Sequence, residues 1–358
     1  MLLSNPEHII AIFKATKQAG AKPATSMALR RAFGASVKAA KYWDADDSGI
    51  AVQPRKAIYK APNERLILAL EKQLNAEGIQ EQRTHYPDLY AFVQSVVGRS
   101  ATKTLMGPYL LELSPDILDD FQIYDKNLLK FLFGWPRCLA RGAYQARDRL
   151  LMAVEKWHTK AHKKASENVD KIAPEDPEFD AYFGFKLIRA RQSAMMKMGV
   201  LDDRDRATPD LGLMFALENE PFLWARHSIF NRKAAFIDEA WNAMGHSPGK
   251  PLAIFDAERF LVAQDINATT QRDEPTFSLE GLAGCWLPFR GGQRMCSGRH
   301  FTKSRMLGTF AMLFTRYELE LAPGVGDVKP DLKWYPTGTL PPSDKVLFRI
   351  RMKVGVQI

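Results

Sequence analysis

The chain of 358 residues is long enough for one large domain or two modest ones. Charged residues make up 25% and apolar residues 46%, the composition of an ordinary folded protein, and the net charge of +9 favours anionic partners such as a membrane surface or an acidic protein. No zinc-binding cysteine pairs and no repeated aromatic and basic motif accompany this charge, which excludes the usual nucleic-acid-binding classes. Three scattered cysteines are too few for a disulfide framework, and this usage is typical of a reducing, intracellular compartment.

The first predicted element is a short amphipathic helix near the N-terminus. Pro6 and Glu7 stand where its first turn begins, and Ile9, Ile10 and Phe13 follow at helical spacing. No segment of the chain approaches the roughly 18 consecutive apolar residues of a membrane span. The sequence therefore predicts no transmembrane segment.

Two further helices are predicted over 63–78 and 88–106. The second carries one apolar stripe, formed by Leu89, Phe92, Val93, Val96 and Val97. Because these residues recur at the spacing of a helix face, we expect them in the core.

A long basic helix is predicted over about 140–168. Its inward face is apolar, with Leu150, Leu151, Val154, Trp157 and Ala161, and its outward face carries Lys156, Lys160, Lys163 and Lys164. His158 and His162 stand four residues apart, as in a zinc-chelating pair, but no third ligand and no zinc-protease glutamate accompany them. We therefore expect the two histidines on a solvated face rather than on zinc.

The C-terminal part predicts a helix followed by two strands. Apolar residues recur at helical spacing after residue 300, namely Met306, Leu307, Phe310, Leu313, Phe314 and Tyr317. Apolar and charged residues then alternate over 317–321 and again over 348–354. These two segments predict a terminal β-hairpin with a Pro/Gly-rich connection.

The segment LPFRGGQRMCSGRHF, residues 287–301, places a single cysteine in a glycine-rich loop directly before that helix. Cys296 is the only soft ligand in the loop, and a helix N-terminus stabilises a thiolate over a thiol. Two plainer alternatives stay open on the residues alone: an inert buried thiol, or an anion-binding turn. A phosphate-binding loop is excluded, because the required Gly-Lys-Ser/Thr does not follow.

The order Phe289, Gly292, Arg294, Cys296 and Gly298 resembles the heme-thiolate loop of the cytochrome P450 family. The resemblance implies that Cys296 is the axial ligand of the heme iron, that Arg294 reaches a heme propionate and that Phe289 shields the sulfur. It also implies that Gly292 and Gly298 let the backbone approach the porphyrin.

The resemblance further implies a mainly α (α+β) cytochrome P450-like fold in a single domain over 1–358. The heme-binding block would span about 241–321 and the terminal β-hairpin about 317–354. The chain opens on a segment similar to the family's early helix, so we expect the N-terminal anchor to be missing. The whole chain would then be an internally shortened member of the family.

Several positions depart from the family pattern. Arg290 stands where glycine is common, and Ser297 where proline is common. No glutamate has an arginine three residues later, so the Glu-x-x-Arg helix region that braces the cysteine loop is expected to be missing, although Arg259 matches its downstream partner. Over 216–220 the sequence is comparable to the oxygen-activating segment, but Pro221 follows and no threonine does. No catalytic residue is therefore assigned.

The activity implied is that of a heme-thiolate monooxygenase, which inserts oxygen from O2 into an apolar small molecule. The sequence of the segment 241–303 resembles that of fungal cytochrome P450s of secondary-metabolite biosynthesis. Two alternatives remain, each motivated by the departures from the pattern. One is a heme-thiolate isomerase or dehydratase that needs no reductase, and the other is an inactive remnant.

The partner implied by the family is NADPH-cytochrome P450 reductase. Cations flank the ligand loop and would ring the face of the heme on the cysteine side: Arg290, Arg294, Arg299, Lys303 and Arg305. Such a ring would attract the carboxylates of a reductase. Lysines of the helix 140–168 could also contact anionic lipid, so we expect a cytoplasmic protein or one held peripherally on the endoplasmic reticulum.

Overall fold

The computed structural model describes residues 6–15, 22–45, 63–164, 177–218, 256, 258–262, 275–282, 286, 289, 299–326, 328–329, 331–337 and 341–355. The chain divides into two compact units, one formed by Met1–Gly20 with Phe222–Cys296 and the other by Ala21–Pro221 with Ser297–Ile358. The single domain over 1–358 therefore stays a prediction.

The described elements of the first unit are few. They are α1 (Pro6–Lys14) and the strands β4 (Leu261–Val262) and β5 (Thr276–Phe277), which pair antiparallel. The ring of Phe260, just before β4, lies 4.9 Å from the ring of Trp286 and 5.9 Å from that of Phe277. Aromatic contacts thus support this small sheet.

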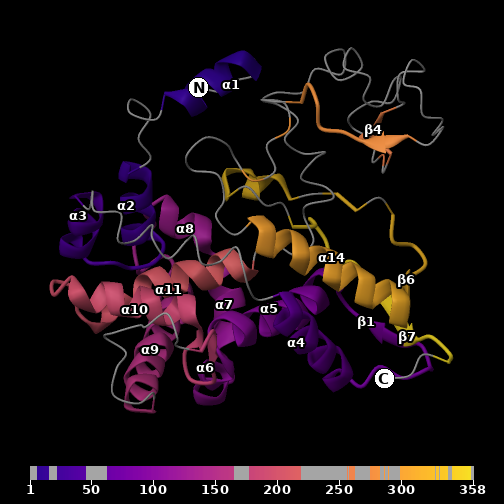
Figure 1. Ribbon diagram of the computed structural model, residues 1–358, viewed down its shortest axis with the longest axis horizontal. Coiled ribbons are helices and arrows are strands. Elements are labelled where there is room, and N and C mark those ends of the chain that lie inside the picture. The colour runs from indigo at the N-terminus through magenta and orange to yellow at the C-terminus, as the bar shows by residue number, and fades with distance from the viewer. Residues whose placement is uncertain are drawn as a thin grey trace. The chain divides into compact units, whose positions relative to one another are not determined.

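The second unit is mainly helical. Its longer helices are α4 (Asn63–Ala76), α5 (Leu89–Leu105), α9 (Arg141–Lys164), α10 (Lys186–Lys197), α11 (Asp203–Glu218) and α14 (Arg299–Arg316). Its shorter helices are α2 (Lys22–Arg31), α3 (Val37–Ala45), α6 (Pro108–Leu113), α7 (Ile117–Asp125), α8 (Leu128–Leu132) and the 3-10 helix Leu332–Thr337. Helix α5 packs against α4 and α11, α11 packs against α9, and α14 packs against α4 (Figure 1).

Helix α5 confirms most of the stripe predicted for 88–106. Phe92, Val93, Val96 and Val97 are all buried, whereas Leu89 is only partly buried. Asp88 caps the start of the helix, because its side chain accepts a hydrogen bond from the backbone N–H of Tyr90. This N–H lies in the first turn, where backbone N–H groups have no carbonyl partner within the helix. The buried face of α5 agrees with its packing against both α4 and α11.

Helix α9 confirms the inward face predicted for the long basic helix. Its five predicted core residues are completely buried, and the four lysines are exposed: Lys156, Lys160, Lys163 and Lys164. The Nε1 of Trp157 donates to the carbonyl oxygen of Tyr182 at 2.7 Å, which satisfies its only polar atom. The prediction of a solvated His158 is wrong, because this side chain is 8% exposed and is hydrogen-bonded inside the unit.

The predicted helix after the cysteine loop is present as α14, but its buried face differs from the apolar pattern. Leu307 and Phe314 are 69% and 54% exposed. The buried residues of α14 are Phe301, Thr302, Arg305, Met306, Thr309, Met312 and Leu313. A polar side chain can lie on this face when its hydrogen bond is local, and Thr309 donates to the carbonyl oxygen of Arg305 at 2.7 Å.

The main sheet has the strand order β1-β7-β6, with β1 at Thr84–Tyr86, β7 at Phe348–Met352 and β6 at Tyr317–Leu321. The two segments predicted from alternation pair antiparallel, with Leu319 opposite Ile350. The opposite face of this pair carries ion pairs, with Glu318 on Arg351 and Glu320 on Arg349. Alternation therefore separates a buried face from a charged one.

A second, two-stranded sheet forms where two glycines let backbones meet. Strand β2 (Phe179–Asp180) pairs with β3 (Gly184–Phe185). Gly184 has φ of +71°, and a Cβ there would lie 2.3 Å from the carbonyl oxygen of Leu105, at the end of α5. Gly107 faces it with φ of +83°. This contact fixes β3 against the turn between α5 and α6.

Candidate functional site

The predicted heme loop lies almost entirely outside the described residues. Of its five key positions, Phe289 is described and its side chain is partly buried, whereas Gly292, Arg294, Cys296 and Gly298 fall outside. The roles given to all five residues stay predictions. The arginine of the downstream segment, Arg259, is buried just before β4.

Helix α11 contains residues 216–218, the described part of the segment 216–220 that was compared with the oxygen-activating segment. Its first turn is acidic, and the Asp202 side chain accepts a hydrogen bond from the backbone N–H of Asp205 at 2.7 Å. The two carboxylate oxygens of Asp205 accept from the N–H and the hydroxyl of Ser36, each at 2.8 Å. Because Ser36 also caps α3 through the N–H of Ala39, this carboxylate ties α11 to α3.

One turn further on, Asp210 is completely buried and is the centre of a polar network between three helices. The Nε2 atoms of His158 from α9 and of Gln192 from α10 lie 3.0 and 2.7 Å from its Oδ2. Arg191 donates to Oδ1 from Nη2 at 3.1 Å and from Nε at 3.3 Å. A buried carboxylate with this many donors is held as an anion.

The pKa of Asp210 reflects opposing effects. Burial alone raises the pKa, but the hydrogen bond from His158 and the positive charge of Arg191 outweigh it, and the pKa of the carboxyl is lowered. The carboxylate of Asp210 therefore stays charged near neutral pH. Its physical effect is to fix the position and rotation of α11 relative to α9 and α10.

The structure does not bring His158 and His162 together around a metal. His158 contacts Asp210, while the ring of His162 packs at 4.9 Å against the ring of Phe183. Among the described residues, no group of three or more histidine, cysteine, aspartate or glutamate side chains is arranged to hold a metal ion.

The sequence analysis missed the network around Asp210. A signal was present, since Asp210 stands between apolar residues in a helix where a carboxylate needs a partner. The partners come from positions 158, 191 and 192, however, and no local pattern connects these positions to Asp210. The contact depends on how the helices pack.

Comparison with proteins of known type shows what this chain resembles. No protein-family model matches the chain. The cytochrome P450 monooxygenase fsoE of Humicola fuscoatra is 27% identical in an alignment of 383 residues that covers 78% of this chain and 65% of the relative. The cytochrome P450 monooxygenase efuG of Hormonema carpetanum is 27% identical over 376 residues, covering 77% of this chain and 66% of the relative.

This chain is similar in sequence to proteins named fungal cytochrome P450 monooxygenases. It spans about two thirds of the length of these two relatives, at 65% and 66%. Both alignments, of 383 and 376 residues, are longer than the 358-residue chain itself, so the relatives contain segments that this chain lacks inside the aligned region. This agrees with the expectation of an internally shortened cytochrome P450.

The fold is similar to that of a solved cytochrome P450. The crystal structure of a cytochrome P450 (CYP102L1) superposes with a TM-score of 0.56 at 14% sequence identity, covering 97% of this chain and 88% of the other. The predicted mainly α, cytochrome P450-like fold is therefore confirmed. Among the helices that the structure describes, none is long and apolar enough to cross a membrane.

Proposed function

We propose that this protein is a heme-thiolate monooxygenase that oxidises an apolar small molecule in secondary-metabolite biosynthesis. One observation carries the proposal: all five positions of the heme-thiolate loop, from Phe289 to Gly298, occur in order in a chain whose relatives are named cytochrome P450 monooxygenases. Cys296 would be the axial ligand of the iron.

The chemistry of the donor set fits a heme. A cysteine before a helix N-terminus supplies a thiolate, the guanidinium of Arg294 suits a propionate, and glycines permit close backbone approach. Phe289 would exclude water from the sulfur. When bound, such a heme supplies the redox centre at which dioxygen is activated.

The described residues have a positioning role in this proposal. Helix α11 leads into the segment that the family places beside the heme, and Asp205 and Asp210 hold it to α3, α9 and α10. The donor of electrons would be NADPH-cytochrome P450 reductase. Of the cations expected to attract this partner, Arg305 is buried and is removed from the set, whereas Lys303 is exposed.

An inactive remnant is the second candidate, and two observations favour it. The chain has no Glu-x-x-Arg pair, and its relatives contain internal segments that it lacks. A remnant would not retain heme. A heme-thiolate isomerase would retain heme but form product without a reductase.

The absorption spectrum of the reduced, carbon-monoxide-treated protein separates a heme-thiolate enzyme from a remnant, and product formation without a reductase would then distinguish an isomerase from a monooxygenase. We expect a strongly red-shifted Soret band, and Cys296→Ser is expected to abolish it, because a neutral hydroxyl is a poor ligand for heme iron. Cys138→Ser is the matched control, since this exposed cysteine lies outside the loop. Absence of any heme band in the parent protein would identify a remnant, and an unchanged band in Cys296→Ser would refute the ligand assignment.

A further inference from the structure

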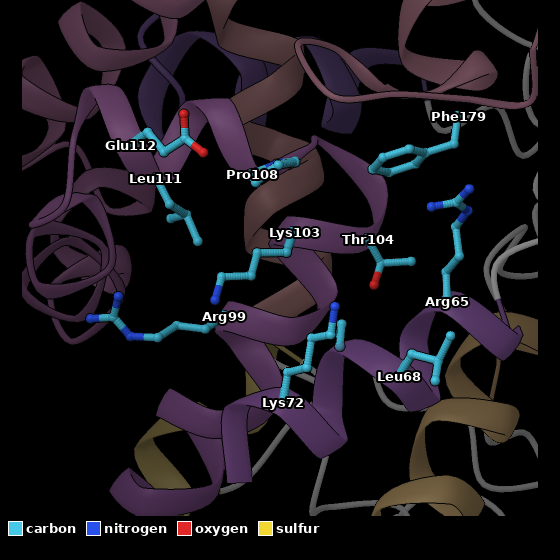
Figure 2. Close-up of a pocket in the computed structure, with 11 residues that line it drawn as sticks. Arg65, Leu68, Lys72, Arg99, Lys103, Thr104, Pro108, Leu111, Glu112 and Phe179 are labelled. Atoms are coloured by element: carbon cyan, nitrogen blue, oxygen red, sulfur yellow. The ribbon is translucent and has the colours of Figure 1, made fainter. Parts of the chain in front are cut away.

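A basic cleft of about 590 Å³ opens between α4, α5, α6 and β2 in the second unit. Figure 2 shows its side chains, which come from positions far apart in the sequence. Four cations line it, two from α4 and two from α5: Arg65, Lys72, Arg99 and Lys103. Among the described residues of the lining, Glu112 is the only carboxylate.

Helix geometry brings these charges together. Arg65 and Lys72 lie seven positions apart on α4, with Leu68 and Ala69 between them on the same face. Arg99 and Lys103 lie four positions apart on α5, which packs directly against α4. Two basic helix faces therefore meet across the cleft instead of pointing away from each other into solvent.

Ion pairs do not neutralise the positive charges of the cleft among the residues that the structure describes. Within the described part of the chain, no carboxylate forms an ion pair with any of the four cations. Lys103 donates to the Gln73 side-chain oxygen at 3.3 Å, and the Arg65 guanidinium stacks 4.2 Å above the ring of Phe179. By contrast Arg316, which also packs against α4, is paired with Glu71 at 2.6 Å.

The electrostatics of Lys103 show the effect of this crowding. Burial lowers its pKa first, and the positive charges of Arg99 and Lys72 lower it further. Like charges held this close repel one another, so a bound anion would stabilise the arrangement. The cleft is therefore electrostatically prepared for a negative group.

The remaining walls are apolar. Leu68, Pro108, Leu111 and Phe179 line the same cleft as the cations. Its volume of about 590 Å³ lies within the roughly 300–1,000 Å³ typical of small-molecule sites. A bare inorganic anion would contact the cations and leave these apolar walls exposed to water.

We propose that this cleft binds an amphipathic organic anion. The carboxylate or phosphate head lies among Lys72, Arg99 and Lys103, and the apolar body packs against Leu68, Leu111 and Phe179. None of the lining residues belongs to the predicted heme loop, and the existence of the cleft does not depend on the proposed monooxygenase activity.

Isothermal titration calorimetry of the full chain at low ionic strength tests the proposal. The probes are decanoate, decyl phosphate, decanol and inorganic phosphate. We expect the two amphipathic anions to bind at least about tenfold more tightly than decanol or inorganic phosphate, because only they use both the charged and the apolar walls. Decanoate and decyl phosphate together show which head group is preferred. Equal affinity for inorganic phosphate would overturn the amphipathic assignment, and no binding of either amphipathic anion would overturn the site.

Variants locate the binding. We expect the double variant Lys72→Gln/Lys103→Gln to bind decanoate about tenfold or more weakly. Leu68→Ser, at an exposed position, is expected to weaken decanoate about threefold without changing the weak binding of inorganic phosphate. Lys160→Gln is the matched control, since this exposed lysine of α9 lies outside the cleft lining.

The double variant also distinguishes the occupant. Its thermal unfolding midpoint should equal or exceed that of the parent, because repulsion around Lys103 is removed. Unchanged decanoate affinity in this variant would place the ligand elsewhere and refute the proposal. Slower reduction by a reductase with unchanged decanoate affinity would instead assign these cations to docking of a protein.

Discussion

Asp210 is the residue on which the described packing of α11 depends most directly. Its carboxylate is fully buried. The side chains of Arg191, His158 and Gln192 lie within hydrogen-bond distance of its two oxygens. We expect Asp210→Asn to lower the free energy of unfolding by about 3 kcal/mol, because removing the charge leaves Arg191 without its buried partner. Urea unfolding followed by circular dichroism measures this loss.

Asp203→Asn is the matched control for this variant, because Asp203 pairs with Arg206 on the same helix but is 72% exposed. A surface pair of this kind contributes at most about 1 kcal/mol. Equal losses in the two variants would contradict the importance given to the buried network.

The same carboxyl predicts a pH dependence of stability. Because the pKa of Asp210 is lower in the folded chain than in the unfolded one, its contribution is fully present above the unfolded value of about 3.9 and is lost as pH falls through the folded value. The difference in unfolding free energy between the parent and Asp210→Asn should therefore be constant from pH 5 to 7 and shrink below about pH 4. Unfolding midpoints in urea across this range provide the measurement. A difference that grows in acid would reverse the assigned sign.

At the scale of elements, the joint between β3 and the α5–α6 turn depends on Gly184. Its φ of +71° disfavours any side chain, and a Cβ would meet backbone atoms of Leu105, Met106 and Gly107 at 2.3 to 2.6 Å. We expect Gly184→Ala to lower the free energy of unfolding by about 3 kcal/mol or more, since strain and a backbone clash add. Thermal or urea unfolding measures the effect.

Gly78→Ala separates the two contributions. Gly78 also has positive φ, at +63°, but a Cβ there would have no neighbour within 4 Å. This control should cost only the conformational strain, about 1–2 kcal/mol. If Gly184→Ala costs no more than Gly78→Ala, the close approach of the backbones does not restrict the joint.

At the scale of the whole molecule, the proposed reductase partner predicts a dependence on charge. Arg299 and Lys303 closely follow Cys296 in the sequence, and Lys303 is exposed on α14. We expect charge reversal at both positions to slow reductase-supported turnover about three- to tenfold at low salt, with a smaller effect near physiological ionic strength. Peroxide-supported turnover and heme content should stay nearly unchanged.

Charge reversal at Lys163 is the control, because this lysine is exposed on α9, away from the segment after Cys296. Equal losses with reductase and with peroxide would show that Arg299 and Lys303 serve folding or heme binding. A reduction rate that does not vary with salt would count against electrostatic docking.

The sequence predicted elements better than it predicted their polar contacts. The helices 63–78, 88–106 and 140–168 were expected from periodicity, and α4, α5 and α9 correspond to them closely. The prediction of the buried face of α14 was only partly correct, because Leu307 and Phe314 are exposed while Arg305 and Thr309 are buried. An apolar pattern cannot identify a buried polar residue whose hydrogen bonds are satisfied within the fold.

By itself, the sequence determined the helices, the alternating strands and the order of the five key residues from Phe289 to Gly298, because each of these depends on residues close together along the chain. Only the tertiary structure decided that His158 is buried against Asp210, and that the cations of α4 and α5 face a common cleft. These arrangements join residues from separate helices, and their distances are set by helix packing. Local periodicity determines which side of a helix is apolar, whereas the crossing of helices determines which charges meet.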